Sequence, residues 1–141
     1  MDFKDSLIKA GEIARKARDY AKEIAKENTK YLEIAEKIEN KILELGGKPA
    51  FPVDVSVDGI AAHDTPLFND ERILKKGDLA KIDLGVHIDG YITDTAVTVE
   101  INSDKNKKLI DAAEKALKEA VKIAIPGTKL FEIGQVIQEQ I

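Results

Sequence analysis

Two aspartates, Asp83 and Asp94, stand on neighbouring strand-like segments and could together hold a metal ion. The segments 80–88 and 91–99 are rich in β-branched residues and flank Asp89-Gly90, a dipeptide that strongly favours a two-residue hairpin turn. Because side chains alternate between the two faces of a strand, this turn places both aspartates on one face as diagonal neighbours. Their Cβ atoms should then lie about 7 Å apart or somewhat less.

The same register predicts what surrounds the two carboxylates. Asp83 should face Ala96, and Asp94 should face Gly85, so small residues leave space above the acids. The opposite face of the hairpin should be a nearly continuous apolar surface that helices cover, formed by Ile82, Leu84, Val86, Ile88, Tyr91, Val97 and Val99.

Two neighbouring ionised carboxylates repel each other, and this repulsion must be offset in the folded chain. At a separation of about 5 Å they repel each other by roughly 3 kcal/mol in a medium of effective dielectric constant about 20. A fold avoids that cost if one acid is protonated, if both are solvated, or if a cation lies between them. Paired carboxylates on a rigid hairpin suit divalent cations, and two-metal hydrolytic sites use bridging carboxylates of this kind. The alternative is a solvated sheet face with two ordinary acids.

The sequence contains two histidines, His63 and His87, as the only nitrogen donors of the metal-binding type. His87 should share the face of the two aspartates near the hairpin tip, where a hydrogen-bonded or exposed histidine is the simpler interpretation. His63 lies among small residues in the segment 61–66, where it could reach a pocket or cap a turn. A dinuclear site needs more ligands than two carboxylates.

Periodicity predicts the elements that position these residues. Apolar residues at helical spacing predict helices over 3–25, 32–45, 109–123 and 128–141, and Thr29 is a suitable N-cap for the second. Alternation over 53–57 predicts a half-buried strand, and the composition of 59–69 predicts a connecting loop.

An internal repeat relates the first two helices to the last two. The pattern Thr29-Lys30-x-x-Glu33-Ile34 recurs as Thr128-Lys129-x-x-Glu132-Ile133, and Leu7-Ile8-x-Ala10 recurs as Leu109-Ile110-x-Ala112. Chance similarity between amphipathic helices rich in Ala, Lys and Glu is the alternative explanation. After the first helix pair the chain continues into a strand and the hairpin, whereas the second pair ends the sequence, so we expect half of a duplicated fold.

Composition limits the class of protein. A chain of 141 residues predicts one domain over 1–141, and 43% apolar with 34% charged residues is typical of a soluble globular protein. No apolar run is long enough for a membrane span, and the start of the chain lacks the apolar core of a signal peptide, so we expect a cytoplasmic protein with no membrane partner. The absence of Cys excludes disulfides and thiol nucleophiles, and a net charge of −4 argues against nucleic acid as a partner.

An ordered set of motifs resembles the methionine aminopeptidases, most closely the archaeal and eukaryotic type 2 branch. The motifs are Phe51-Pro52, Ala61-Ala62-His63-x-Thr65-Pro66, Gly77-Asp78, Lys81-Ile82-Asp83-x-Gly85-x-His87-x-x-Gly90 and Asp94-x-Ala96-x-Thr98-Val99. The similarity runs from about residue 7 to residue 141 and covers the N-terminal half of that family's catalytic domain.

The resemblance implies a fold and a chemistry. The fold would be α+β, half of a pita-bread fold, in which an antiparallel sheet with a central hairpin is covered by two helix pairs. Asp83 and Asp94 would be two of five ligands to a pair of divalent metal ions (Co, Mn, Fe or Zn), with Asp94 bridging both. His63 would contact the substrate near the scissile bond and stabilise the transition state, and Phe51 would line the pocket for the methionine side chain. The reaction would be the hydrolytic removal of the N-terminal methionine from nascent proteins.

Several features depart from the family pattern. The family's other three ligands, one His and two Glu, come from its C-terminal half, so we expect a truncated chain that is weak or inactive alone, with an incomplete metal site. Its partner would be the missing half or a second copy in a homodimer. Asp58, Asp64 and Asn28 replace a common Asn, a common aromatic residue and a usual Gly. Two alternatives stay open: a non-catalytic pita-bread binding module, and another pita-bread hydrolase such as a prolidase or aminopeptidase P.

Overall fold

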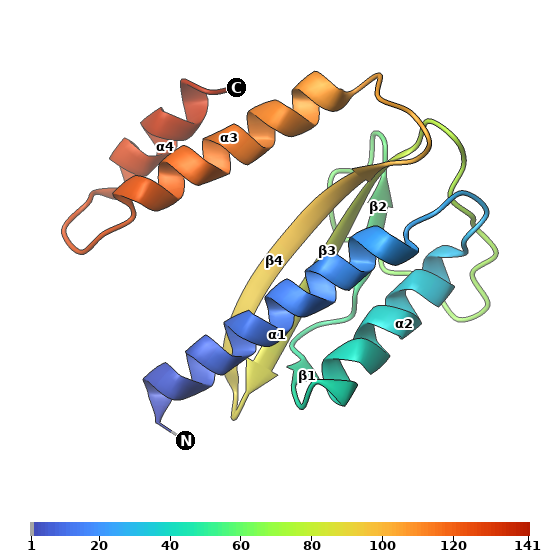
Figure 1. Ribbon diagram of the computed structural model, residues 1–141, viewed down its shortest axis with the longest axis horizontal. Coiled ribbons are helices and arrows are strands. Elements are labelled where there is room, and N and C mark those ends of the chain that lie inside the picture. The colour runs from blue at the N-terminus through green and yellow to red at the C-terminus, as the bar shows by residue number, and fades with distance from the viewer. Residues whose placement is uncertain (1) are drawn as a thin grey trace. The chain divides into compact units, whose positions relative to one another are not determined.

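The computed structural model describes residues 2–141 and contains two compact units, Met1–Ser103 and Asp104–Ile141. The first unit holds the sheet and two helices, and the second holds two further helices (Figure 1). The prediction of a single domain over 1–141 stays a prediction.

The sheet of the first unit is antiparallel and is organised around one long strand. Strand β3 (Leu79–Ile88) pairs along one edge with β4 (Tyr91–Glu100), and along the other edge with β1 (Lys48–Pro49) and β2 (Asp54–Val57). The hairpin register is confirmed: Ile88 pairs with Tyr91, Asp83 with Ala96 and Gly85 with Asp94. Asp89 and Gly90 have φ angles of 52° and 86°, as a tight turn between twisted strands requires. The strand predicted over 53–57 is β2, whereas the two-residue β1 was missed.

One face of this sheet carries the helices α1 (Phe3–Ile24) and α2 (Tyr31–Glu44), which lie side by side (Figure 1). Helix α1 presents a stripe of small buried residues to the sheet, which permits close approach: Ala10, Ala14, Ala17 and Ala21. Helix α2 contributes Ile34, Ile38 and Ile42, all fully buried with Ile82, Leu84 and Val86 in one hydrophobic core. Each such side chain stabilises the fold by about 1.5–3 kcal/mol when it leaves water. The predicted apolar face is therefore confirmed for the β3 residues and for Val97 and Val99, which are partly buried against this core, whereas Tyr91 is 38% exposed.

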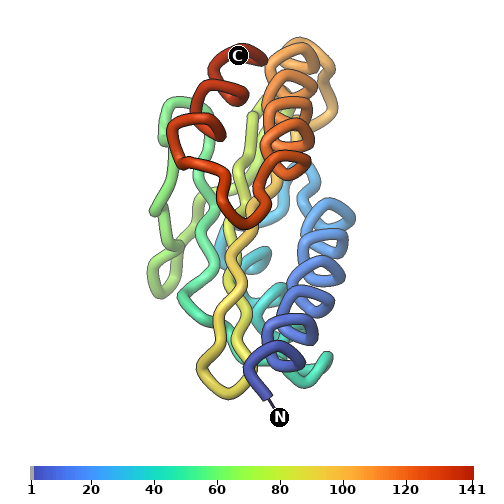
Figure 2. Tube along the Cα trace, turned by 90° about the vertical axis from the view of Figure 1, so that its left-hand side faces the viewer, coloured from blue at the N-terminus to red at the C-terminus, as the bar shows by residue number. Residues whose placement is uncertain are grey.

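The ends of the helices show what the sequence could and could not predict. Lys30, not Thr29, is the N-cap of α2, and no side chain caps this helix. The main chain of Thr29 is occupied elsewhere, because its carbonyl accepts a hydrogen bond of 3.0 Å from the Leu74 amide. The predicted Thr29 cap is therefore wrong. The start of α1 lies beside the hairpin turn (Figure 2). The rings of Phe3 and Tyr91 meet there edge to face, with centroids 5.2 Å apart.

The second unit is a helix pair, α3 (Lys107–Ile123) and α4 (Leu130–Gln138), which pack on each other. The Thr128 hydroxyl donates to the Ile123 carbonyl at 2.6 Å, and Glu132 accepts from the Lys129 amide at 2.9 Å. Lys129 is the N-cap of α4, as Lys30 is of α2, so the predicted repeat of helix pairs is present.

An antiparallel sheet with separate helices confirms the α+β class. Helices α1 and α2 cover the sheet as predicted, and cover by the second pair stays a prediction. Among residues 2–141, no helix is both long and apolar enough to cross a membrane.

Candidate active site

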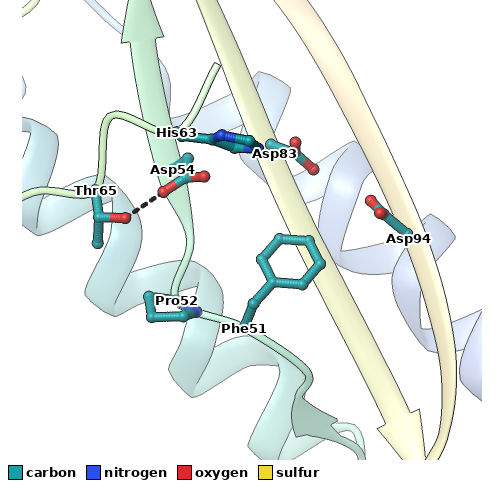
Figure 3. Close-up of a pocket in the computed structure, with 7 residues that line it drawn as sticks. All are labelled: Phe51, Pro52, Asp54, His63, Thr65, Asp83 and Asp94. Carbon is teal, nitrogen blue, oxygen red and sulfur yellow. Dashed lines mark hydrogen bonds between the residues drawn. The ribbon is translucent and has the colours of Figure 1, made fainter.

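The face of the sheet opposite the helices α1 and α2 carries a pocket that contains the four residues to which the resemblance assigned a site role, Phe51, His63, Asp83 and Asp94. The cavity measures about 380 Å³. Its lining consists of Phe51, Pro52, Asp54, His63, Thr65, Asp83 and Asp94 (Figure 3). Phe51 lies in the segment that joins β1 to β2, Asp54 is the first residue of β2, and His63 lies in the loop that follows β2. Asp83 lies in β3 and Asp94 in β4. The structure therefore brings together four positions that lie up to 43 residues apart in the sequence.

Asp83 and Asp94 project from adjacent strands into this pocket, with their carboxylates turned toward each other (Figure 3). Asp83 is half-buried, whereas Asp94 is exposed. Burial raises the pKa of Asp83 above its usual value, and the neighbouring charges of Asp94 and Asp54 raise it further. The Oδ1 atom of Asp83 is buried without a hydrogen-bond partner among the described residues. A buried carboxylate oxygen that nothing satisfies is costly, and a cation would both satisfy it and cancel the repulsion.

These residues fit half of a divalent metal site. Carboxylate oxygens are suitable ligands for divalent cations, and the two acids sit on a rigid hairpin, which fixes their separation. Within the part of the chain that the structure describes, no group of three or more His, Asp or Glu is arranged to hold a metal ion.

A third acid, Asp54, lies in the same pocket and was missed by the sequence analysis. Asp54 is directly opposite Asp83 in the β2–β3 register and is only 6% exposed. It accepts a hydrogen bond from the hydroxyl of Thr65 (Figure 3). Alternation along 53–57 placed Asp54 on the polar face of its strand, but that face is covered by the loop that carries His63, and no local signal predicts such cover.

Phe51 reaches the pocket because the chain leaves the sheet between β1 and β2. The Ala50 amide still donates to the Gly85 carbonyl at 2.9 Å, and Pro52 then has no N–H to continue the ladder. The Phe51 ring lies directly over Gly85. A Cβ atom on Gly85 would stand 2.3 Å from Cε1 of that ring, so only glycine leaves room for it.

His63 lies at the mouth of the pocket on a backbone of left-handed conformation, with φ of 61°. This conformation is uncommon for residues other than glycine, although His tolerates it better than most. The loop is held to β2 by two contacts of the residue after His63: the Val55 amide donates to the Asp64 carbonyl at 3.0 Å, and the Asp64 amide donates to the Ser56 hydroxyl at 3.3 Å. These contacts of Asp64 fix the main chain next to His63.

The remaining candidates have structural explanations. His87 lies outside the pocket, where its Nδ1 accepts from the Gly90 amide at 3.2 Å and closes the hairpin turn. Asp58 accepts from the Leu79 amide at 2.9 Å through its side chain, and its own carbonyl accepts from Lys81 at 2.8 Å. Asn28 has a φ of 68°, a conformation that glycine favours and that Asn adopts more readily than most residues.

The sequence of this chain is similar to those of known metallopeptidases. The model of metallopeptidase family M24 matches residues 5–141. A methionine aminopeptidase of Pyrococcus horikoshii is 52% identical over 137 residues, which cover 97% of this chain and 46% of that protein. The chain therefore spans about half the length of such relatives.

Solved structures share the fold. A methionine aminopeptidase from Thermotoga maritima superposes with a TM-score of 0.86 at 24% identity, over 97% of this chain and 58% of that chain. A prolidase from Pyrococcus horikoshii gives a TM-score of 0.84 at 31% identity, over 97% of this chain and 40% of that chain. The predicted relation to the pita-bread enzymes is thereby confirmed.

Proposed function

Because the chain belongs to metallopeptidase family M24, we propose that it supplies part of the active site for the metal-dependent removal of N-terminal methionine from nascent proteins. The observation that carries this proposal is the pairing of Asp83 and Asp94 on adjacent strands in one pocket, where a buried oxygen of Asp83 has no partner among the described residues. Nascent chains arise in the cytoplasm, and the same proposal places this protein there.

Each lining residue has a proposed role. Asp83 and Asp94 would hold the divalent ions (Co, Mn, Fe or Zn), which would supply Lewis-acid activation of water and of the peptide carbonyl. Asp94 is exposed and is therefore accessible to a cation from solvent. Phe51 and Pro52 form an apolar wall that suits a methionine side chain.

His63 would contact the substrate beside the scissile bond. Its ring lies at the mouth of the pocket on the β2 side, facing the hairpin that carries the two acids (Figure 3). A histidine in that place can donate a hydrogen bond to oxygen that gains negative charge in the transition state.

Two carboxylates are too few for two metal ions, so we propose that further donors come from a second polypeptide segment. That segment would be a C-terminal half of the family type or a second copy of this chain. Exposed apolar residues on α3 and α4 could bury against such a partner, among them Leu117, Val121 and Phe131. Light scattering should show a dimer at high concentration, and a clean monomer would count against the second copy.

Two alternative functions are separable from this one. A prolidase would cleave a dipeptide that ends in proline, and the solved prolidase is 31% identical to this chain, whereas the methionine aminopeptidase relative is 52% identical. A binding module would need neither metal nor turnover. The higher identity and the intact acid pair favour the methionine aminopeptidase.

A peptide assay with Met-Ala-Ser and with a dipeptide that ends in proline tests the proposal. The chain is combined with a C-terminal half from a methionine aminopeptidase relative, and Mn²⁺ or Co²⁺ is added. We expect methionine release only from the combination, and we expect Asp94→Asn to abolish it. Release by the chain alone would mean that its ligand set is complete, and cleavage of the proline dipeptide alone would favour a prolidase.

A further inference from the structure

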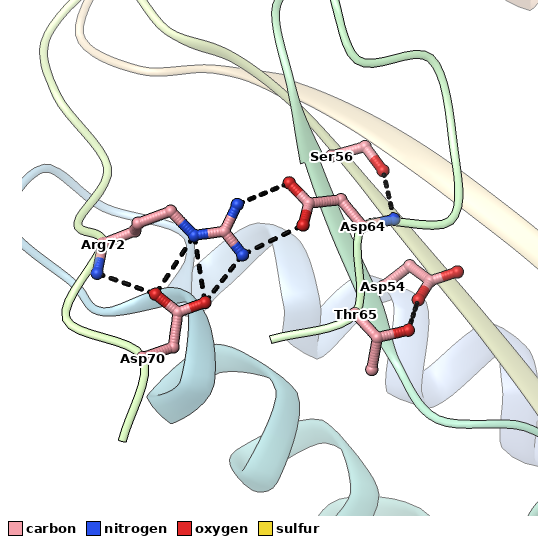
Figure 4. A network of polar contacts seen from close by, with 6 residues as sticks. All are labelled: Asp54, Ser56, Asp64, Thr65, Asp70 and Arg72. Carbon is pink, nitrogen blue, oxygen red and sulfur yellow. Dashed lines mark hydrogen bonds and ion pairs between the residues drawn. The ribbon is translucent and has the colours of Figure 1, made fainter. Parts of the chain in front are cut away.

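Arg72 joins two acidic side chains of the loop that carries His63. Its Nη1 and Nη2 atoms donate to the two carboxylate oxygens of Asp64 at 2.7 and 2.9 Å (Figure 4). Its Nε and Nη2 atoms donate to Asp70 at distances of 2.6 to 3.1 Å. One guanidinium therefore grips both acids in the forked geometry that makes such pairs strong. The two carboxylates are largely covered, with side chains 15% and 6% exposed, whereas the Arg72 side chain is 42% exposed.

Arg72 is itself anchored to the helical layer. Its guanidinium lies 4.9 Å from the ring centroid of Tyr31, which is buried at the start of α2, and its carbonyl accepts from the Tyr31 amide at 3.0 Å. Two residues further on, Leu74 is fully buried and makes main-chain hydrogen bonds with Asn28 and Thr29. The main chain around Arg72 is therefore attached to the start of α2, and the hydrogen bonds of Arg72 attach Asp64 and Asp70 to the same place.

One of the two acids that Arg72 holds, Asp64, is the neighbour of His63. Asp64 is tied to β2 through its main chain, by the contacts to Val55 and Ser56, and to Arg72 through its side chain. The next residue, Thr65, donates to Asp54 in the pocket wall. The strained, left-handed backbone of His63 therefore depends on the anchored residues 64 and 65 to keep its conformation.

The hydrogen bonds of this network favour the charged forms of Arg72 and Asp70. Those from Arg72 lower the pKa of Asp70, and those to Asp70 and Asp64 raise the pKa of Arg72 further above its already high value.

We propose that Arg72 is a positioning residue that sets the orientation of His63 at the pocket by clamping Asp64 to Asp70. The role of His63 at a substrate rests on the function proposed above, whereas the clamp itself does not. The acid at position 64 is what the clamp requires, because both of its carboxylate oxygens accept from the Arg72 guanidinium.

Nuclear magnetic resonance of the two histidine rings tests the proposal on the full chain without metal or peptide. His63 and His87 are the only histidines, so each variant gives two ring spin systems. We expect Arg72→Gln to shift or broaden the His63 ring signals and to leave those of His87 in place. Hydrogen exchange at the Val55 amide, which donates to Asp64, should accelerate by about tenfold or more, as loss of a charge-assisted hydrogen bond predicts.

Three further variants sharpen the result. Glu71→Gln removes the neighbouring ion pair with Lys30, at 2.7 Å, and should leave both histidines unchanged. Asp70→Asn lies seven positions from His63 and should move its ring signals in the same direction as Arg72→Gln, because it loosens the guanidinium. Arg72→Lys should fail to restore the wild-type signals, because an ammonium cannot grip two carboxylates in a fork.

The proposal is overturned if Arg72→Gln and Asp70→Asn, both folded by circular dichroism, leave the His63 signals where Glu71→Gln leaves them. The Arg72 side chain is 42% exposed and lies outside the hydrophobic core, so Arg72→Gln should fold. If one of these two variants does not fold, the other carries the test. A failed peptide assay with shifted His63 signals would reject the proposed function and keep the clamp.

Discussion

Replacing Gly85 by alanine should displace the Phe51 ring and destabilise the chain. The added Cβ would lie 2.3 Å from Cε1 and 2.7 Å from Cδ1 of Phe51, and 3.0 Å from the Cβ of Ala50, whereas ordinary contacts are 3.4–4 Å. The ring must therefore move by about 1 Å or leave the pocket. Overpacking of this kind costs about 1–3 kcal/mol. The sign is informative, because alanine in place of a strand glycine is otherwise stabilising by about 0.5–1 kcal/mol.

Urea unfolding followed by circular dichroism measures this effect. Gly59→Ala is the matched control, since a Cβ at Gly59 meets nothing within 4 Å, and its free energy of unfolding should change by less than about 0.5 kcal/mol. Removing the ring should relieve the clash, so Gly85→Ala should cost at least about 1 kcal/mol less in a Phe51→Ala background than in the wild type. Equal stability of the Gly85 and Gly59 variants, or an unchanged cost in the Phe51→Ala background, would refute the close contact that places Phe51 in the pocket.

Other variants test the electrostatics, the core and the hairpin. Burial and two neighbouring carboxylates raise the pKa of Asp83, so its ionised form costs stability above that raised pKa and costs nothing below the ordinary value of about 4. In metal-free buffer Asp83→Asn should therefore unfold at higher urea than the wild type at pH 7, and this advantage should vanish as the pH falls below 4; a constant advantage would disprove the pKa shift. Ile38→Ala should cost about 2–5 kcal/mol in urea unfolding, against less than about 1 kcal/mol for the exposed Leu43→Ala, and similar costs would contradict the core position of α2. Gly90→Ala should lower the melting temperature because its φ of 86° suits glycine, and an unchanged melting temperature would argue against this turn.

The hairpin and its acids could be predicted because the rules involved are local. A two-residue turn and a side-chain period of two together fix which residues face each other, so the shared face of Asp83 and Asp94 follows from Asp89-Gly90 alone. The burial of Ile82 and Leu84 follows from the same alternation. Local pattern was sufficient wherever one turn determined one register.

The rest of the pocket depends on contacts between distant segments. Phe51 lies over Gly85 because it falls between β1 and β2, where the chain leaves the edge of β3. No sequence pattern near Phe51 or Gly85 predicts this close approach. Asp54 is buried by a loop that is itself held by Arg72, which stands 18 positions further along the chain. Thr29 has the right residue type for a helix cap, but its main chain pairs with Leu74 instead. In each case a long-range contact overrides what the local sequence favours.

The most direct test of the metal site is calorimetric titration with Mn²⁺ of the wild type and three single variants. Asp83→Asn and Asp94→Asn each remove one proposed ligand, and Asp89→Asn removes the same charge from the same hairpin outside the pocket, at a φ of 52° that Asn accepts. We expect a binding heat in the wild type and in Asp89→Asn, and its loss in the other two. Indistinguishable heats from all four proteins would contradict a cation site between these acids.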